Sequence, residues 1–441
     1  MIAHHDRHLP TREELLRVTA RPIGRGVKVA SAVFAVIGTL IFLFGAIRGD
    51  DRAWQSFHVN WLFFASISQA AIVLVAVQRI TTARWSRPVV RFLEGYVAFL
   101  PIALVLLGVI FLGRHHIFPW THEAPPFPEK VRWFEPGFLI TRDLVTFGIL
   151  VLLSVWFVYT SLRLDVGRSE EMGARWARGL RARMRRGFGD ERREIHATHS
   201  RQGRLAVFLC LAFGFFMSLL SWDLSMSLDM HFQSTLYSWW FFMGGWLGAI
   251  MSWSMLTMWW RRHLDAYDLV TEHHFHDLGK LCFAFTAFWG YLTFGQYLVI
   301  WYGNLGEETH WARLRLIAPW LKLTLPVVFL MFVLPFFGLM SRAAKVYLPT
   351  LAFFALCSLA GLWLLRYIEV YPSLHYESHD VPFGFYEIGV TLGYLGIWGL
   401  CYSAFMDAFP RLRVTLLTSP YRDQVQVPYD PETLETIPAH E

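Results

Sequence analysis

Charged residues and cysteines are scarce in this sequence of 441 residues. Asp, Glu, Lys and Arg make up 17% of it, whereas a soluble domain carries roughly a quarter, so the composition excludes an ordinary soluble protein. The absence of any CxxC pair excludes a zinc knuckle, a cysteine-ligated iron–sulfur cluster and a CxxCH haem-attachment site. The four cysteines fall in four separate apolar runs, where we expect small buried residues: Cys210, Cys282, Cys357 and Cys401.

Long apolar runs dominate instead, and 55% of the residues are hydrophobic. A helix needs about 20 mostly apolar residues to cross a hydrocarbon core of roughly 30 Å. The runs are continuous and do not alternate with a period of two, which favours helices over a membrane β-barrel. The sequence therefore predicts an all-α polytopic membrane protein with ten transmembrane helices, near residues 27–47, 61–80, 92–112, 139–162, 203–226, 235–260, 278–301, 316–339, 348–369 and 386–409.

Basic residues are distributed unevenly between alternate loops. The N-terminal arm, the turn at 79–91 and the loop at 163–204 are rich in Lys and Arg, and the opposite loops are poor in them. Because positive charge remains on the cytoplasmic side, this asymmetry predicts cytoplasmic termini. We attribute the net charge of +6 to orientation and expect no nucleic-acid partner. The opposite loops hold Arg48, Arg52, Arg114, Lys130, Arg132, Arg313 and Arg315.

The segments outside the predicted spans are an N-terminal arm (1–26) and a polar tail (410–441), flanking a transmembrane domain at 27–409. No apolar core follows a short basic stretch at the start, so we expect no cleavable signal peptide. In the long basic loop, RWARGLRARMRR predicts an amphipathic helix at the lipid headgroups, and a solvated loop is an equal alternative.

Histidines give no sign of a haem or metal site. All eighteen lie in loops or at the ends of the predicted spans, whereas an embedded b-type haem needs two facing histidines inside the membrane. The segment HLDAYDLVTEHHFHDLGKL is rich in titratable groups, but its histidines lack the i, i+4 spacing of helical metal ligands. We interpret it as a proton-collecting mouth that includes Asp277 and Lys280, with helix capping by Asp277 as the alternative.

A few ionisable residues fall inside the spans, where each is costly without a partner or a water path. Glu94 and Asp223 have short side chains that do not reach the headgroups, so we predict that they handle protons. For Arg142, Lys322 and Asp407, which lie near span ends, we favour snorkelling to the membrane surface.

The densest polar segment is SWDLSMSLDMHFQSTLYSWWFFMGGW, between the fifth and sixth spans. Titratable groups held this close shift one another's pKa values, as proton release or quinol oxidation requires. The alternative is that Asp229 or Ser234 caps a helix end. The candidate residues are Asp223, Asp229, His231, Ser234, Thr235 and Tyr237.

Two segments resemble a known family. WDLSMSLDMHFQSTLYSW and HDLGKLCFAFTAFWGYLTFGQYLVIWYGNLGEET are similar to the second of the two NrfD-like membrane subunits of alternative complex III, a bacterial quinol:electron-acceptor oxidoreductase of the cytoplasmic membrane. The resemblance extends over nearly the whole chain. It implies two four-helix bundles, formed by spans two to five (about 61–226) and six to nine (about 235–369), with flanking helices.

The resemblance also implies partners and a role. In such complexes a sibling NrfD-like subunit holds the quinol site beside an iron–sulfur subunit, and c-type cytochrome subunits receive the electrons. The second NrfD-like subunit carries no redox centre or cofactor of its own, has been named quinone-binding by analogy, and has been proposed to supply proton half channels. By position, His231, Ser234 and Thr235 match a turn where quinol-binding members place a His-x-x-Thr-like pattern, although Phe232 and Gln233 follow the histidine here.

Three hypotheses follow. The first is a membrane subunit without a redox centre that supports assembly and carries protons from Asp277 and Lys280 through Glu94 toward Asp223, Asp229, His231 and Tyr237. In the second, the chain itself binds a quinol at the turn 221–240, through His231, Ser234 and Thr235. The third is a secondary transporter, for which Pro326 and Pro335 interrupt the eighth span but no matching pair interrupts the other half.

Overall fold

The predicted ten spans are confirmed. A computed structural model describes residues 11–19, 21–125, 127–169 and 172–419, so the first ten residues of the predicted arm and the tail after 419 lie outside the described residues. No strand occurs in these ranges, and ten helices in them are long and apolar enough to cross a membrane. They are α2 (Arg25–Arg48), α3 (Asp51–Ile80), α4–α5 (Val90–Leu112), α7 (Pro136–Arg168), α9 (Glu191–Leu224), α10 (Thr235–Leu264), α11 (Glu272–Gly303), α13–α14 (Leu321–Gly338), α16 (Leu348–Leu374) and α17 (Phe385–Ala408).

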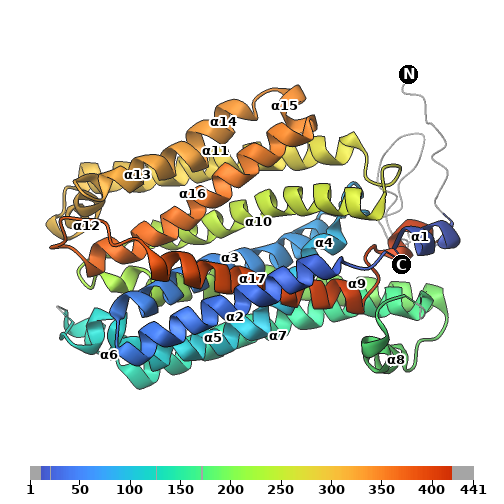
Figure 1. Cartoon of the computed structure of the whole chain (residues 1–441), viewed down its shortest axis with the longest axis horizontal. Helices are drawn as coiled ribbons and strands as arrows, with labels where there is room; N and C mark the ends of the chain where they lie inside the picture. Colours follow the sequence, from blue (N-terminus) through green and yellow to red (C-terminus); the bar gives the residue numbers. More distant parts are fainter. Residues whose placement is uncertain (1–10, 20, 126, 170–171, 420–441) are drawn as a thin grey trace, which may run out of the picture.

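Short helices cover the two ends of this bundle (Figure 1). We call the end that carries α1, α8, α15 and α18 the basic end, because the Arg-rich segments gather there, and the end that carries α6 and α12 the opposite end. The predicted basic helix at the loop 163–204 is present as α8. The short helices are α1 (Arg12–Thr19), α6 (Pro128–Trp133), α8 (Arg178–Arg185), α12 (Gly306–Leu316), α15 (Arg342–Val346) and α18 (Val414–Thr418).

Several predicted boundaries were wrong because helices extend beyond their apolar runs. Helix α3 begins at Asp51 instead of residue 61, and α9 begins at Glu191 instead of residue 203. The earlier start of α3 places His58 inside a helix and fully buried, which corrects its assignment to a loop or span end. Its Nε2 lies 2.7 Å from the carbonyl oxygen of Leu224, so the backbone at the end of α9 satisfies this ring nitrogen.

The spans form two four-helix bundles, as the family resemblance implies. Helices α3, α5, α7 and α9 pack together, as do α10, α11, α13–α14 and α16. Helices α2 and α17 pair along one side, against α3 (Figure 1). Their backbones approach closely through glycines, since a Cβ added to Gly38 would lie 2.2 Å from the Cα of Gly393. Small residues at a helix contact allow such close packing, which substitutes for the hydrophobic effect inside a bilayer.

Helix α3 joins the bundles. It contacts α9, α10, α16 and α17, and most of its side chains are buried. Polar groups on α3 bond to its neighbours: Gln69 donates to Ser154 Oγ at 2.9 Å, and Asn60 Oδ1 accepts from the indole of Trp363 at 3.1 Å. Because lipid offers no hydrogen bonds, these polar residues need partners inside the protein, which explains why this helix is central.

The eighth span is interrupted, as its prolines predict. Helix α13 (Leu321–Val328) contains Pro326, a π-helical turn follows at Phe329–Val333, and α14 (Leu334–Gly338) has Pro335 in its first turn. A proline has no backbone N–H to donate a hydrogen bond, and its ring crowds the preceding turn, so the helix widens locally at the π-helical turn. Among the described residues, no other span contains a π-helical turn.

The outward-facing side chains are apolar. On α2, exposed valine, leucine and phenylalanine side chains cover the outer face, and on α11 an exposed aromatic row follows the helix period. A soluble protein would place polar residues there, so this surface suits lipid or a membrane partner. These residues are Val29, Val33, Val36, Leu40 and Phe44 on α2, and Tyr291, Phe294, Tyr297, Trp301 and Tyr302 on α11.

Candidate functional site

Asp223 lies near the end of α9 and is fully buried in an ion pair. The Arg142 guanidinium of α7 donates to its Oδ2 from Nη2 at 2.7 Å and from Nε at 3.0 Å. The indole of Trp133 donates to Oδ1 at 2.8 Å, and the Arg142 guanidinium stacks 4.0 Å from the centre of the same indole ring. Two groups thus donate three hydrogen bonds to one carboxylate, which compensates its burial.

Asp143 follows Arg142 on α7 and has no comparable compensation. Its side chain is fully buried close to Asp223, and no donor among the described residues reaches either carboxyl oxygen. Of the two carboxyl groups, the Arg142 guanidinium therefore bonds only to that of Asp223, although Asp143 lies close enough to interact with its charge. Sequence reasoning assigned Asp143 no role, because its proximity to Asp223 depends on how α7 packs against α9.

Tyr237 belongs to a second buried group, between the two bundles. Its hydroxyl lies 2.6 Å from Ser225 Oγ, which donates in turn to Glu369 at 3.4 Å. Arg366 donates to both oxygens of Glu369 at 2.8 Å and to the carbonyl oxygen of Phe241 at 2.8 Å. This group connects α9, α10 and α16 at the opposite end.

The rest of the turn is exposed or serves the backbone. Asp229 Oδ1 accepts from the amides of His231 and Phe232 at 3.2 and 3.3 Å, which lie in the turn and in no helix, so this residue does not cap a helix end as the alternative required. The side chains of His231 and Thr235 are exposed. Ser234 makes no capping bond and instead donates to Gln296 Oε1 on α11 at 3.0 Å.

An apolar cavity of about 130 Å³ lies next to Gln296 in the second bundle. Its walls come from α10, α11, α12, α13 and α16, and its lining includes Trp240, Trp289, Trp311 and Arg315. Arg315 is held by backbone carbonyl groups, including that of Ile368 at 2.9 Å, and its guanidinium stacks 3.9 Å from the ring of Trp311. Burial lowers the pKa of Arg315 to about 10, so it remains protonated at neutral pH.

Glu94 lies at the basic end in a balanced group of charges. It pairs with Arg91, accepts from Ser161 Oγ at 2.8 Å and lies 3.8 Å from Arg413 Nη1. Arg91 also pairs with Asp165, whose Oδ1 accepts from the amide of Thr415 at 2.8 Å. The spacing of Arg91 three residues before Glu94 was a signal that sequence reasoning missed.

Asp277 and Lys280 form an ion pair of 2.7 Å at the basic end of α11, and both are partly exposed. The nearby Thr271 and His274 form a capping box at the start of α11, so His274 has a structural role. No group of three His, Cys, Asp or Glu side chains placed to hold a metal ion occurs in the described residues.

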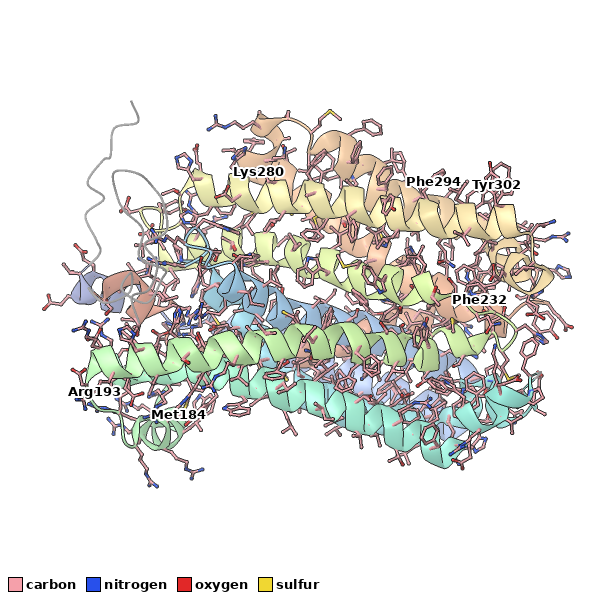
Figure 2. All side chains as sticks on the ribbon, turned by 180° about the vertical axis from the view of Figure 1, so that it is seen from behind. Met184, Arg193, Phe232, Lys280, Phe294 and Tyr302 are labelled. Atoms are coloured by element: carbon pink, nitrogen blue, oxygen red, sulfur yellow. The ribbon has the colours of Figure 1, made fainter. Side chains whose placement is uncertain are left out.

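The sequence-predicted candidates do not form one site. Figure 2 shows Lys280 and Phe232 toward opposite ends of the molecule. At the opposite end, Asp223 belongs to the first bundle, Tyr237 lies between the bundles, and Ser234 faces the second bundle. The turn was treated as one cluster because its residues are adjacent in sequence, but the helix ends direct them to different neighbours.

The expected snorkelling was wrong for two of three residues. Arg142 turns inward to Asp223, and Asp407 pairs with Lys28 of α2 and with Arg411 at 3.3 Å. In both cases an opposite charge within the protein replaces contact with the headgroups. Lys322 is exposed, as that expectation requires.

Ten apolar helices, buried ion pairs at both ends and an apolar outer surface define a multi-pass all-α membrane protein. No family model matches the chain, and a search of curated proteins finds no match.

Proposed function

We propose that this chain is a membrane subunit of a quinol-oxidising electron-transfer complex, without a redox centre of its own, which supports assembly and conducts protons through its first helical bundle. The motif resemblance to the NrfD-like subunits of alternative complex III supports the assignment to such a complex. The distribution of Lys and Arg supports a bacterial cytoplasmic membrane with the basic end in the cytoplasm. Iron–sulfur clusters and c-type haem would reside in partner subunits.

A polar stripe on α7 is the observation that carries the proton pathway. Asp143, Ser154, Ser161 and Asp165 lie within about 40° of one another around the helix at 100° per residue, and all four are buried. From the first to the last they extend about 33 Å at 1.5 Å per residue, which matches a hydrocarbon core of roughly 30 Å. Apolar residues alone would pack this face at lower cost.

Each position of the stripe bonds to or faces a polar group of another element in the first bundle. Asp143 faces Asp223 of α9, Ser154 accepts from Gln69 of α3, and Ser161 donates to Glu94 of α4 (Val90–Glu94). A carboxyl group buried without a partner is more stable with its proton than as an ion, so Asp143 is a suitable proton carrier. Asp277 and Lys280 lie in the second bundle, and the pathway proposed here does not need them.

The complex itself is tested first. Purified in mild detergent from its native membrane, the chain should bring with it iron–sulfur and c-type cytochrome subunits, identified by mass spectrometry and a reduced-minus-oxidised spectrum, with quinol:acceptor activity. A chain that purifies alone and colourless would contradict membership of such a complex and would make a secondary transporter the leading explanation.

We expect Asp143→Asn to lower proton release per electron at least several-fold in proteoliposomes, because the amide keeps the volume of the side chain but cannot carry the proton. Proton release is measured with a pH-sensitive dye while quinol oxidation is followed by absorbance. Glu13→Gln, at an exposed position of α1 at the basic end, is the control and should have no effect. If Asp277→Asn lowers proton release per electron and Asp143→Asn does not, the pathway lies in the second bundle instead.

Quinol binding by this chain is the second candidate, and the apolar cavity beside Gln296 favours it. Three indole rings and one buried guanidinium suit a flat ring with polar carbonyl oxygens, and Ser234 links the cavity to the predicted turn. A photoreactive azido-quinone should then label peptides of α10, α11 or α12, and excess unmodified quinone should suppress the labelling. Labelling confined to other subunits would refute this candidate.

A further inference from the structure

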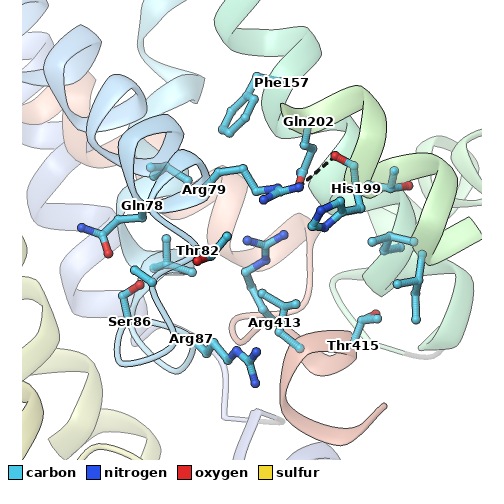
Figure 3. Close-up of a pocket in the computed structure, with 17 residues that line it drawn as sticks. Gln78, Arg79, Thr82, Ser86, Arg87, Phe157, His199, Gln202, Arg413 and Thr415 are labelled. Atoms are coloured by element: carbon cyan, nitrogen blue, oxygen red, sulfur yellow. Dashed lines mark hydrogen bonds between the residues drawn. The ribbon is translucent and has the colours of Figure 1, made fainter. Parts of the chain in front are cut away.

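A second cavity, of about 90 Å³, lies at the basic end of the first bundle (Figure 3). It is bounded by the last turns of α3, the turn that follows it, α7, the start of α9 and the chain at 413–416. A single water needs only roughly 10–15 Å³ of such space, so the cavity admits a larger group. None of the proposed proton carriers lines it.

Among the described residues, the lining of this cavity is cationic and includes no carboxylate. Arg79, Arg87 and Arg413 contribute guanidinium groups, and the remaining polar lining consists of neutral hydroxyl, amide and imidazole side chains. Figure 3 shows the guanidinium groups of Arg79 and Arg413 turned toward one another across the cavity. Like charges this close repel, so an anion between them would be stabilised by both.

Within the described part of the chain, no carboxylate pairs with Arg79 at this cavity. In the charged group around Glu94, described above, the positive charges of Arg91 and Arg413 offset the negative charges of Glu94 and Asp165. Arg79 makes no ion pair with any described residue. Among these residues it donates one hydrogen bond, to the carbonyl oxygen of His199 at 2.9 Å. A guanidinium held in this position without a counter-charge is costly.

Buried polar atoms in the lining also lack partners. Arg413 is 8% exposed and Thr415 is 2% exposed, and neither the Arg413 Nε nor the Thr415 hydroxyl has a hydrogen-bond partner among the described residues. Both groups can donate. Buried donors are normally satisfied, so these two indicate a missing acceptor.

We propose that this cavity binds a phosphate group, held by Arg79 and Arg413. Guanidinium groups match phosphate oxygens in a planar, two-pronged geometry, and the hydroxyl of Thr415 offers a further donor. The phosphate can belong to a phospholipid headgroup or be inorganic. The cavity lies at the last turn of α3, where a spanning helix reaches the headgroup layer, and basic pockets between spans at this depth suit anionic lipids.

The first test is native mass spectrometry of the protein, or of its complex, purified in mild detergent. We expect about one retained phospholipid per chain in the wild type, and a loss of roughly tenfold or more in occupancy in Arg79→Gln, with Arg79→Lys intermediate. Arg201→Gln is the matched control, because this arginine lies on the same stretch of α9 but is exposed and outside the cavity. It should retain the lipid.

The second test separates the two sources by thermal unfolding of delipidated protein. A short-chain phosphatidic acid should raise the Tm of the wild type but not that of Arg79→Gln. A rise with inorganic phosphate alone, without retained phospholipid, would support the site with a free anion as its ligand. The proposal is overturned if no phospholipid is retained, neither probe changes the Tm, and Arg79→Gln is at least as stable as the wild type. In a cavity without an anion, removing one of two repelling guanidinium groups would raise the stability of the folded protein.

Discussion

Arg142→Ala should destabilise the folded protein by about 3–5 kcal/mol, because it leaves the carboxylate of Asp223 buried without its counter-charge. The loss has three parts. Two charge-assisted hydrogen bonds of 2.7 and 3.0 Å disappear, the stacking of the guanidinium on Trp133 is lost, and Asp143 no longer has a cation beside it. The loss of stability is measured from the change in the midpoint of SDS unfolding in mixed micelles, which tryptophan fluorescence follows.

Arg132→Ala is the control for this prediction. Arg132 lies at the same end of the molecule, on the exposed side of α6, so its removal changes the net charge equally but breaks no described ion pair. It should change stability by less than about 0.5 kcal/mol. Adding Asp223→Asn to Arg142→Ala should recover part of the loss, since the unpaired charge is then gone. Equal effects of the two single arginine variants would show that the buried pair does not stabilise the fold.

Gly38→Ala should separate α2 from α17 at a cost of about 3 kcal/mol, the upper part of the range for overpacking. The added Cβ would meet Gly393 Cα at 2.2 Å and Gly393 N at 2.4 Å, and backbone atoms cannot rotate away as a side chain can. The whole helix would have to shift. Unfolding in mixed micelles gives the stability, and protease cleavage between α2 and α3 reports the loosened helix.

The control is Gly26→Ala, on the same helix. A Cβ at Gly26 meets nothing within 4 Å, so the substitution should be neutral or slightly stabilising through the higher helix propensity of alanine. If both alanine variants unfold at the same detergent fraction, the contact between Gly38 and Gly393 is looser than the structure indicates.

Hydropathy predicted the number and order of the spans because crossing a membrane requires a long apolar run, which is visible without knowing any contact. It failed at the start of α3, where Gln55, His58 and Asn60 look like loop residues. These side chains lie in a helix that neighbouring helices cover on nearly all sides, so their polar groups bond to neighbours and the helix continues through them.

The candidate site was harder to predict, because its contacts are distant in sequence. The partner of Asp223 is Arg142, that of Ser234 is Gln296, and Tyr237 reaches Glu369 through Ser225. Neither composition nor spacing contains this information, which depends on which helix faces which. Ion pairs within one helix could have been predicted from the sequence, since Arg366 and Glu369 have the i, i+3 spacing that brings side chains together.

The chain at 411–415 has a consequence for how the protein is made. Glu94 and Asp165 enter the membrane early in synthesis, but Arg413 and the backbone amide of Thr415 that contact them are made only after the last of the ten spans. Lys28 of α2 likewise enters early and gains its partner Asp407 only when the last span is complete. Until those last residues arrive, the base of the first bundle holds carboxylates without their full set of partners. A nascent chain that stops before Arg411 therefore differs electrostatically from a finished one, although all ten spans are already present.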